Sequence, residues 1–207
     1  MDAVELMNVG VNYLREHVTS KARIHYTTDS GGFSPNIVPP RAGSWYFVRA
    51  PHISEVKEIL ERVRKVAEGA CLMTETSMEM KIDYGCCELL ENHAYADLAY
   101  ENLKEAKLPS YTEEELAFAS KLEDTLSGET VENARKLYDT EGLPLAMKVG
   151  IRDLYQRNPL TASSDSGDVS YIMPMCLIST VCWPAAVSPH TWQASASAGS
   201  SIGEKGA

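Results

Sequence analysis

The chain has 207 residues, which is enough for one large domain or two small ones. Apolar residues make up 44% and charged residues 23%, as in ordinary folded domains. A net charge of −10, with no basic stripe to offset it, argues against binding to nucleic acid or to anionic membranes. Neither a signal-peptide pattern nor an apolar run long enough for a bilayer is present, so we expect a soluble, cytoplasmic protein.

The cysteines do not form a recognisable metal or disulfide pattern. There are five of them, with no CxxC pair: Cys71, Cys86, Cys87, Cys176 and Cys182. On a strand, two adjacent cysteines point to opposite faces, which is poor geometry for joint ligation. We therefore expect buried free thiols rather than a zinc–thiolate site or a disulfide framework.

The first part of the chain predicts a helix followed by two strands. Residues 2–17 have apolar side chains at helical spacing, which Gly10 weakens. Residues 21–28 are typical of a strand, with His25 on the face opposite its two neighbours in sequence. Residues 44–50 are rich in aromatic and β-branched side chains and predict a second strand.

The next segments complete an α+β pattern. Residues 53–72 carry an apolar stripe opposite a charged face, with Ser54 as the expected N-cap. Residues 74–87 alternate enough to predict a third strand, and residues 92–107 predict a second amphipathic helix. With residues 36–39 as extended edge structure, this order predicts a small antiparallel sheet with two helices on one face.

After Pro109 the pattern becomes mainly helical and then weakens. A capping box at residues 112–115 predicts a helix to about Leu126, and a short acidic helix follows. Residues 162–168 are small and polar, as in a loop, whereas residues 169–182 are apolar and could form a buried strand.

His25 is the first candidate for chemistry. Gly31-Gly32 and an Asn-x-x-Pro turn that begins at Asn36 follow it, and such turns place polar side chains at a surface. As a hydrogen-bond donor, His25 could stabilise a developing oxyanion. The alternative is a structural histidine that is satisfied within its own sheet, and the pattern alone leaves both open.

His190 is the second candidate. Pro189 makes the approach to it rigid, Trp192 could wall one side, and a neutral imidazole suits zinc. Zinc needs three or four protein ligands, however, and the chain contains no HExxH, HxH or His/Asp cluster. Spacing alone therefore does not establish a metal site.

Three charged residues have both a functional and a structural interpretation. Asp165 and Asp168 could bind a cation or orient an imidazole, or they could belong to a solvated loop or cap a helix. Arg49, at the end of a strand, could pair with a substrate carboxylate, or it could simply extend its charged end into water.

Taken in order, several motifs of this chain resemble one family. The family is that of the zinc-dependent aminoacylases and carboxypeptidases, which are amidohydrolases and metallopeptidases. Within it, the motifs resemble the branch of the B-type subunit of p-aminobenzoyl-glutamate hydrolase. The resemblance covers nearly the whole chain and thins between residues 127 and 160. Its motifs are the segment 2–17, Ala22–Tyr26 (ARIHY), Gly31-Gly32, Pro35–Pro39 (PNIVP), Trp45-Tyr46, Val48–Pro51 (VRAP), Ser163–Ser170 (SSDSGDVS) and Pro189–Gln193 (PHTWQ).

The resemblance implies a catalytic α/β domain interrupted by a lid domain. Residues 1–18 would be the end of the N-terminal part of the catalytic domain, and residues 19–109 would form the lid. Residues 110–207 would form the C-terminal part of the catalytic domain, which is incomplete. The lid would be a ferredoxin-like, four-stranded antiparallel sheet with two helices on one face, through which the protein forms a homodimer. The implied reaction is hydrolysis of an amide, of the p-aminobenzoyl-glutamate or N-acyl amino acid type, by water activated on zinc or manganese.

The resemblance also implies roles for single residues. The residue matching His25 reaches the active site of the partner subunit and stabilises the tetrahedral intermediate. Asn36 would help to hold the substrate, and His190 would be a metal ligand.

The chain departs from the family at two places. The N-terminal part of the catalytic domain is missing, with the other metal ligands and the general-base glutamate, and the usual Ser-Ile-x-His-Lys-Gly-Met reads Ser201–Ala207 (SIGEKGA), with Glu204 in place of the histidine. Because zinc-assisted hydrolysis needs several ligands and an acid–base residue in one pocket, we expect a fragment that is inactive alone. The alternative is a non-catalytic dimerisation module.

Overall fold

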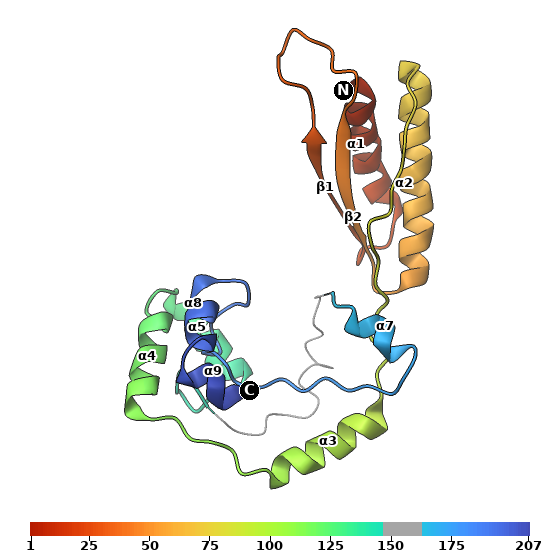
Figure 1. The fold of residues 1–207 in the computed structure, drawn as a ribbon. Coiled ribbons are helices and arrows are strands. Elements are labelled where there is room, and N and C mark those ends of the chain that lie inside the picture. Colours follow the sequence, from red (N-terminus) through yellow and green to blue (C-terminus); the bar gives the residue numbers. More distant parts are fainter. Residues whose placement is uncertain (147–162) are drawn as a thin grey trace. The chain divides into compact units, whose positions relative to one another are not determined.

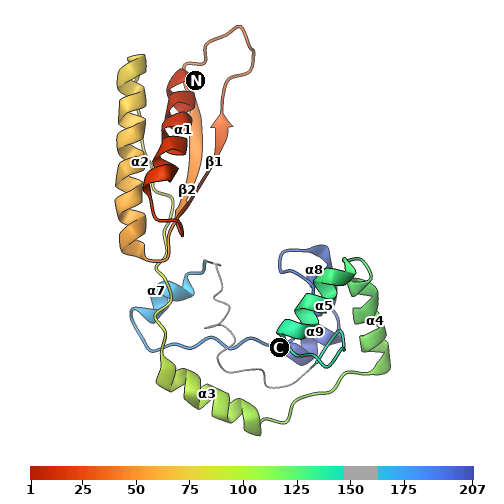
Figure 2. The same ribbon diagram turned by 180° about the vertical axis from the view of Figure 1, so that it is seen from behind.

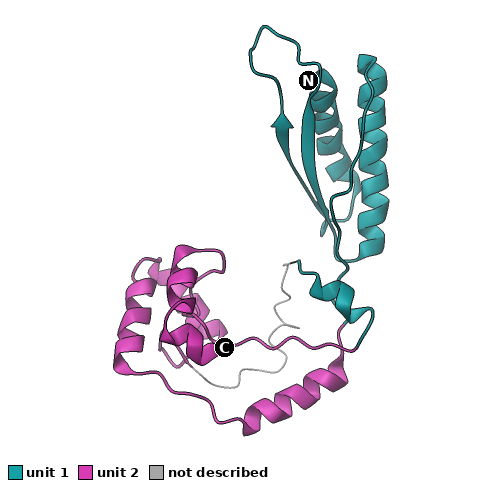
Figure 3. Ribbon diagram, viewed as in Figure 1, with its two compact units in different colours: residues 1–90, 163–173 teal, residues 91–162, 174–207 magenta. Residues whose placement is uncertain are grey.

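The structure is a computed structural model that describes residues 1–146 and 163–207 (Figure 1). The chain divides into two compact units, drawn in different colours in Figure 3. Unit 1 comprises residues 1–90 and 163–173, and unit 2 comprises residues 91–162 and 174–207. The domain boundaries expected after residues 18 and 109 stay predictions.

Unit 1 contains a β-hairpin, two long helices and one short helix. In chain order its elements are α1 (Asp2–Leu14), the 3-10 turn η1 (Arg15–His17), β1 (Arg23–Ser30), β2 (Gly43–Arg49), α2 (Ile53–Thr74) and α7 (Ser166–Ser170). The expected helix at 2–17 and the two expected strands at 21–28 and 44–50 are therefore confirmed.

The core of unit 1 lies between the hairpin and its two long helices. β1 and β2 pair antiparallel, so that Ile24 lies opposite Val48 on the face that α1 and α2 cover (Figures 1 and 2). The fully or nearly buried members of this core are Val11, Leu14, Ala22, Ile24, Ile59 and Val63. Burial of each large aliphatic side chain contributes roughly 1.5–3 kcal/mol, so these contacts hold the four elements together.

The start of α2 differs from the expectation. His52, not Ser54, is the N-cap residue, and its backbone N–H donates a hydrogen bond to the Glu55 carboxylate at 3.2 Å. The helix ends at Thr74, where Glu75 takes a left-handed conformation with φ of 54°. A left-handed residue is a common helix terminator, and here it turns the chain back along α2.

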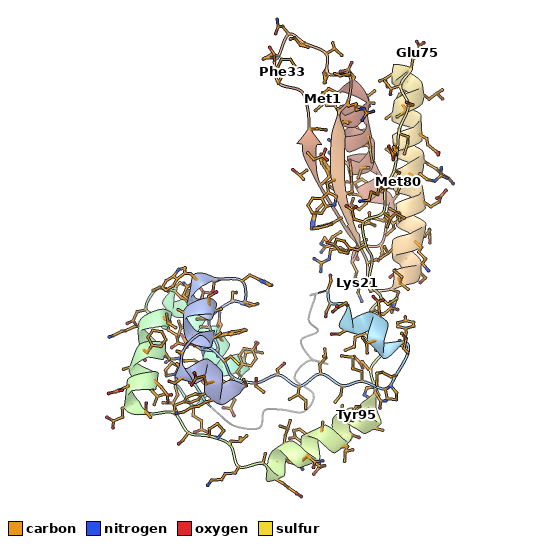
Figure 4. The ribbon with its side chains drawn as sticks, in the orientation of Figure 1. Met1, Lys21, Phe33, Glu75, Met80 and Tyr95 are labelled. Carbon is orange, nitrogen blue, oxygen red and sulfur yellow. The ribbon has the colours of Figure 1, made fainter. Side chains whose placement is uncertain are left out.

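The α+β class is confirmed, but the four-stranded, ferredoxin-like sheet is not formed in the part of the chain that the structure describes. The only sheet there has two strands, and neither residues 36–39 nor residues 76–92 belong to it. The third strand expected at 74–87 is wrong: Thr74 belongs to α2, and residues 76–87 pair with neither strand of the sheet. The segment that follows runs back along α2 with Met80 and Ile82 40% and 64% exposed (Figure 4).

The helix pair on the sheet also differs from the expectation. The second helix of the layer is α1, which packs against α2 in the same core. The helix predicted at 92–107 forms as α3 (His93–Glu105), but it belongs to unit 2 and has no buried residue. Helical periodicity predicts the element correctly and cannot say which surface it covers.

The described part of unit 2 consists of helices and their connections. Besides α3 these are α4 (Glu113–Glu123), α5 (Gly128–Leu137), α8 (Trp192–Ala198) and α9 (Ser201–Gly206). Ala119, Leu145 and Ile202 form its buried core. The capping box at Thr112 and Glu115 is confirmed, as are the two helices expected between residues 112 and 138.

Two smaller expectations are wrong. Residues 169–182 form no strand: their first two belong to α7, and Ile172 and Ile178 are 86% and 53% exposed. The five cysteines are free thiols as expected, but each is partly exposed rather than buried. No helix among the described residues combines the length and apolar character that a membrane crossing requires.

Candidate functional site

The face of the hairpin that points away from the core carries the first candidate residue. Strand alternation places His25 on this face, opposite Phe47 on β2, and leaves its side chain exposed. The prediction that His25 lies on the face opposite Ile24 is therefore confirmed. Trp45 and Phe47 lie on the same face, with ring centroids 5.1 Å apart.

Two arginines join His25 at one end of this face. Arg23 and Arg49 are direct cross-strand partners, and His25 is diagonal to Arg49. Diagonal neighbours in a hairpin lie about 7–8 Å apart, within reach of long side chains. We call Arg23, His25 and Arg49 the cationic corner.

The cationic corner has defined hydrogen bonds. The Arg23 guanidinium donates to the backbone carbonyls of Ser20 and Ala22, each at 2.7 Å. The Arg49 guanidinium donates to Ser163 Oγ at 2.8 Å, which connects it to the SSDSGDVS motif. Like charges directly opposite each other destabilise a hairpin, so this pair of arginines suits a surface that receives an anion. Sequence reasoning missed Arg23, although the strand register that places His25 also predicts its position.

Asn36 lies at the other end of the hairpin. It belongs to the loop between β1 and β2, where its Oδ1 accepts a hydrogen bond from Ser34 Oγ at 2.5 Å. Phe33 in this loop and Lys21 before β1 lie at opposite ends of unit 1 (Figure 4). Five strand residues separate His25 from the loop, a span of about 17 Å. One protomer therefore does not bring His25 and Asn36 together.

The SSDSGDVS motif packs onto the segment that follows α2. Asp168 Oδ1 accepts a hydrogen bond from the Cys87 N–H at 2.9 Å, and Ser170 Oγ accepts one from the Leu90 N–H at 2.9 Å. The bond from the Cys87 backbone, with a further one from the Cys87 side chain, lowers the pKa of the Asp168 carboxyl, because both stabilise its charged form. Asp168 thus has a structural contact in this protomer, and Asp165 is the residue that precedes α7.

Gly167 allows this close packing. A Cβ atom at this position would lie 1.9 Å from the backbone oxygen of Cys87. Only glycine therefore fits between α7 and the Cys87 backbone.

Glu88, in the same segment after α2, contacts the N-terminus of α2. Its Oε2 accepts a hydrogen bond from the Ile53 N–H at 2.9 Å, and its Oε1 lies 3.0 Å from His52 Nδ1. The bond from Ile53, with further bonds from His52 and Tyr171, lowers the pKa of Glu88 to about 2. Glu88 therefore supplies a negative charge at the first turn of α2. No sequence pattern marks this role, because Glu88 contacts residues far from it in the chain.

His190 lies in unit 2, immediately before α8. Its side chain is exposed and its φ is 65°, a left-handed value that is uncommon outside glycine. The next residue, Thr191, is the N-cap of α8 and accepts a hydrogen bond from the Ala194 N–H at 3.3 Å. Trp192 is 63% exposed.

The described residues do not fit a zinc or manganese centre. Among them, no group of three or more His, Cys, Asp or Glu side chains is placed to hold a metal ion. His190 alone is too few ligands for zinc. Whether His190 ligates a metal thus stays a prediction that requires ligands from outside these residues.

Glu204, at the position of the expected family histidine, is exposed on α9. Its neighbour Lys205 forms an ion pair with Glu115 at 2.6 Å, and Ser201 Oγ donates to the same carboxylate at 2.7 Å. Lys205 and Ser201 lower the pKa of Glu115 to about 2. The SIGEKGA motif therefore anchors α9 to the first turn of α4.

Comparisons with known proteins support the family resemblance. The chain is 36% identical, over its whole length, to the B-type subunit of p-aminobenzoyl-glutamate hydrolase from Escherichia coli, of which it spans 46%. It is 25% identical to the Xaa-Arg dipeptidase of Mus musculus, over 84% of this chain and 31% of that protein. It is also 26% identical to the Xaa-Arg dipeptidase of Homo sapiens, over 39% of this chain and 19% of that protein. The chain thus spans less than half the length of these relatives, and no family model matches it.

Proposed function

Because the chain is a homologue of the B-type subunit of p-aminobenzoyl-glutamate hydrolase over its whole length, we propose that it serves an amide-hydrolysing enzyme of that type. Its β1–β2 hairpin would bind the acyl amino acid substrate. The names of the relatives, a p-aminobenzoyl-glutamate hydrolase and two dipeptidases, support hydrolysis of an amide bond.

The cationic corner is the observation that carries this proposal. An arginine guanidinium binds a carboxylate through a planar fork of N–H groups, and two of them face each other here. p-Aminobenzoyl-glutamate carries carboxylates at one end and an aromatic ring at the other. The exposed rings of Trp45 and Phe47, on the same face, offer a surface for that ring.

In this proposal His25 donates a hydrogen bond to the oxygen that becomes negative when the amide is attacked. Such donors stabilise the transition state when they are held in place before the reaction. His25 is exposed on a paired strand, which fixes its backbone and lets its ring reach a group outside its own unit.

We further propose that the enzyme is a homodimer. The separation of Asn36 from His25 supports this, because two protomers could place the loop of one near the corner of the other. The Escherichia coli relative is by its name one subunit of an enzyme, so a different partner chain is the alternative source of the missing groups.

A metal ion would supply the activated water in the intact enzyme. Zinc or manganese would need His190 together with ligands that the described residues do not provide. This chain's own proposed share is therefore to bind the carboxylate through Arg23 and Arg49 and to hold the His25 proton near the reacting oxygen.

The test is to titrate p-aminobenzoyl-glutamate into the purified chain and to monitor binding through the NMR signals of the His25 imidazole and the Trp45 indole. Arg49→Met should weaken binding at least tenfold. Arg41→Met is the matched control, because Arg41 is an exposed arginine in the hairpin loop and should leave the affinity unchanged. Equal affinities of the two variants would refute the role of the cationic corner.

A hydrolysis assay and light scattering test the rest of the proposal. With zinc or manganese added, the chain alone should release no p-aminobenzoate, because residues 1–146 and 163–207 offer no complete set of metal ligands. Turnover that disappears on His190→Ala would contradict this. A monomer at all concentrations would rule out the homodimer.

A further inference from the structure

Three aromatic rings meet on the outer face of the hairpin, and only two of them belong to the hairpin itself. Phe47 is in contact with both of the others: its ring centroid lies 5.1 Å from that of Trp45 and 6.4 Å from that of Tyr84. Tyr84 comes from the segment after α2, which has neither helix nor strand. We call Trp45, Phe47 and Tyr84 the aromatic triad.

The rings of the aromatic triad are steeply inclined to one another and remain accessible. The Phe47 ring makes an angle of 66° with Trp45 and 65° with Tyr84. Trp45 is 48%, Phe47 42% and Tyr84 69% exposed. On such a surface an added aromatic ring can lie against the face of one ring and meet the edge of another, which are the contacts that aromatic pairs prefer. A saturated ring has no π-system, so it gains only from burial.

Contacts that follow Tyr84 in the chain hold it beside Phe47. The Cys87 N–H donates a hydrogen bond to Asp168 Oδ1 at 2.9 Å, and Glu88 Oε2 accepts one from the Ile53 N–H at 2.9 Å. These bonds attach the segment to α7 and to the first turn of α2. Tyr84 thus reaches the outer face through tertiary contacts rather than as part of the sheet.

The aromatic triad lies next to the cationic corner. Phe47 and Arg49 share the outer face of β2 two residues apart, a span of about 7 Å, and His25 is opposite Phe47. In an acyl amino acid, only the amide group and the Cα atom stand between the acyl group and the α-carboxylate. A carboxylate bound at Arg49 would therefore place an aromatic acyl ring at Phe47, within reach of Tyr84.

We propose that Tyr84 determines the specificity of this site for aromatic over saturated acyl groups. The inference rests on the proposed function, because the cationic corner must hold the carboxylate. Phe47 forms the floor against which the acyl ring lies, and Tyr84 adds a second ring contact that only a flat aromatic group can use. A Tyr84 that merely shielded Phe47 from water would not distinguish between ligands of equal size.

The experiment compares N-benzoyl-glutamate with N-cyclohexanecarbonyl-glutamate, which share the amide and both carboxylates and differ only in the ring. Each is titrated into the full chain, and the amide NMR signal of Arg49 and the indole signal of Trp45 report binding. The unchanged chain should bind the benzoyl compound about tenfold more tightly. Tyr84→Leu should reduce this preference roughly threefold by weakening the benzoyl compound alone, and Tyr84→Phe should keep it.

Tyr13→Leu is the matched control. Tyr13 is 70% exposed, close to the 69% of Tyr84, but it lies on α1, which covers the other face of the hairpin, so this variant should keep the preference.

The outcomes separate this inference from the proposed function. The role of Tyr84 would be overturned by an unchanged preference in Tyr84→Leu whose amide spectrum shows it folded, by equal weakening of both ligands, or by loss of the preference in Tyr84→Phe. Equal affinities of the unchanged chain for the two ligands would overturn it as well, and all of these results leave carboxylate binding at the cationic corner intact. Binding of neither ligand would overturn the proposed function and this inference with it.

Discussion

Asp168 accepts a hydrogen bond from the Cys87 N–H at 2.9 Å, although 81 residues separate them in sequence. Ser170 and Leu90 repeat this relationship at 2.9 Å across 80 residues. Two side chains of α7 thus satisfy the backbone of a segment that has no helix or strand of its own. The motif that contains Asp168 therefore attaches α7 to the segment after α2, whatever further role it has in a complete enzyme.

Gly167→Ala should break this contact. The added Cβ would lie 1.9 Å from the Cys87 oxygen, so α7 must move away and the Asp168 bond must open. We expect faster hydrogen exchange at the Cys87 and Leu90 amides and a loss of stability. Exchange at these amides that matches the unchanged protein would contradict the packing described here.

Gly69→Ala should have the opposite effect. Gly69 lies within α2, and a Cβ there would meet no atom within 4 Å. Alanine is favoured over glycine inside a helix by about 1 kcal/mol, so thermal unfolding should shift upward. Gly10→Ala is the control: in α1 its Cβ would lie 2.6 Å from Val66 Cγ1, which should cancel the gain.

Glu88→Gln should destabilise unit 1 by about 1 kcal/mol. The variant removes a negative charge from the N-terminal turn of α2 and weakens the bond to the Ile53 N–H. Urea unfolding measures the change. Glu58→Gln, on the exposed side of the same helix, should leave the free energy of unfolding nearly unchanged; a loss as large as that of Glu88→Gln would exclude a specific contact.

Lys205→Met should reveal a pH dependence of α9. The bond from Lys205, with those from Ser201 and the Thr112 backbone, lowers the folded-state pKa of Glu115 to about 2, from an ordinary value of 4.5. A depressed carboxyl pKa stabilises the folded state fully above pH 4.5, and this contribution is lost as the pH falls toward 2. Amide exchange in α9 should therefore differ between the variant and the unchanged chain at neutral pH, and the difference should shrink in acid.

Lys121→Met provides the comparison for this experiment. Lys121 is exposed on α4, so its removal should not alter exchange in α9 at any pH. An α9 that exchanges equally in Lys205→Met and in the unchanged chain at pH 7 would show that the ion pair does not anchor it.

Hydrogen exchange also tests the reach of the sheet. Ile24, Tyr26, Tyr46 and Val48 lie in the paired strands, and the amides that form the ladder there should be protected. Residues 77–84 have no helix or strand, so their amides should exchange within the dead time of a manual experiment. Protection of alternate amides from Met78 to Tyr84 would instead show a third strand.

Local sequence patterns predicted the helices and strands of this chain more accurately than they predicted which elements pack together. Helical spacing predicted α1, α2 and α3, and a capping box predicted α4. Alternation placed His25 on the outer face of β1. These patterns depend on residues close in sequence. The segment after α2 also alternates, yet it forms no strand, because pairing requires a partner that sequence alternation does not specify.

The site followed the same division. His25 could be predicted as an exposed strand residue, and Arg49 as the end of the next strand. The contacts of Glu88 and Glu123 could not be predicted. Glu88 accepts a hydrogen bond from the Ile53 N–H and Glu123 pairs with Arg135, and both contacts join residues that are distant in sequence. Resemblance supplied roles for Asn36 and His190 that neither pattern nor geometry could give.

The two-stranded sheet has a practical consequence for work with this protein. β2 pairs with β1 on one side, and no strand among the described residues pairs with its other edge. Free strand edges of two molecules can pair with each other, and such pairing leads to aggregation as the protein concentration rises. Ser44 and Val48 are unsuited to a protective lysine, because Ser44 Oγ contacts Asn8 of α1 and Val48 packs against the core. Trp45 and Phe47 are exposed on the outer face of β2, so a lysine at either position would set a charge beside that edge. Such a charge should therefore raise the concentration at which the protein stays in solution.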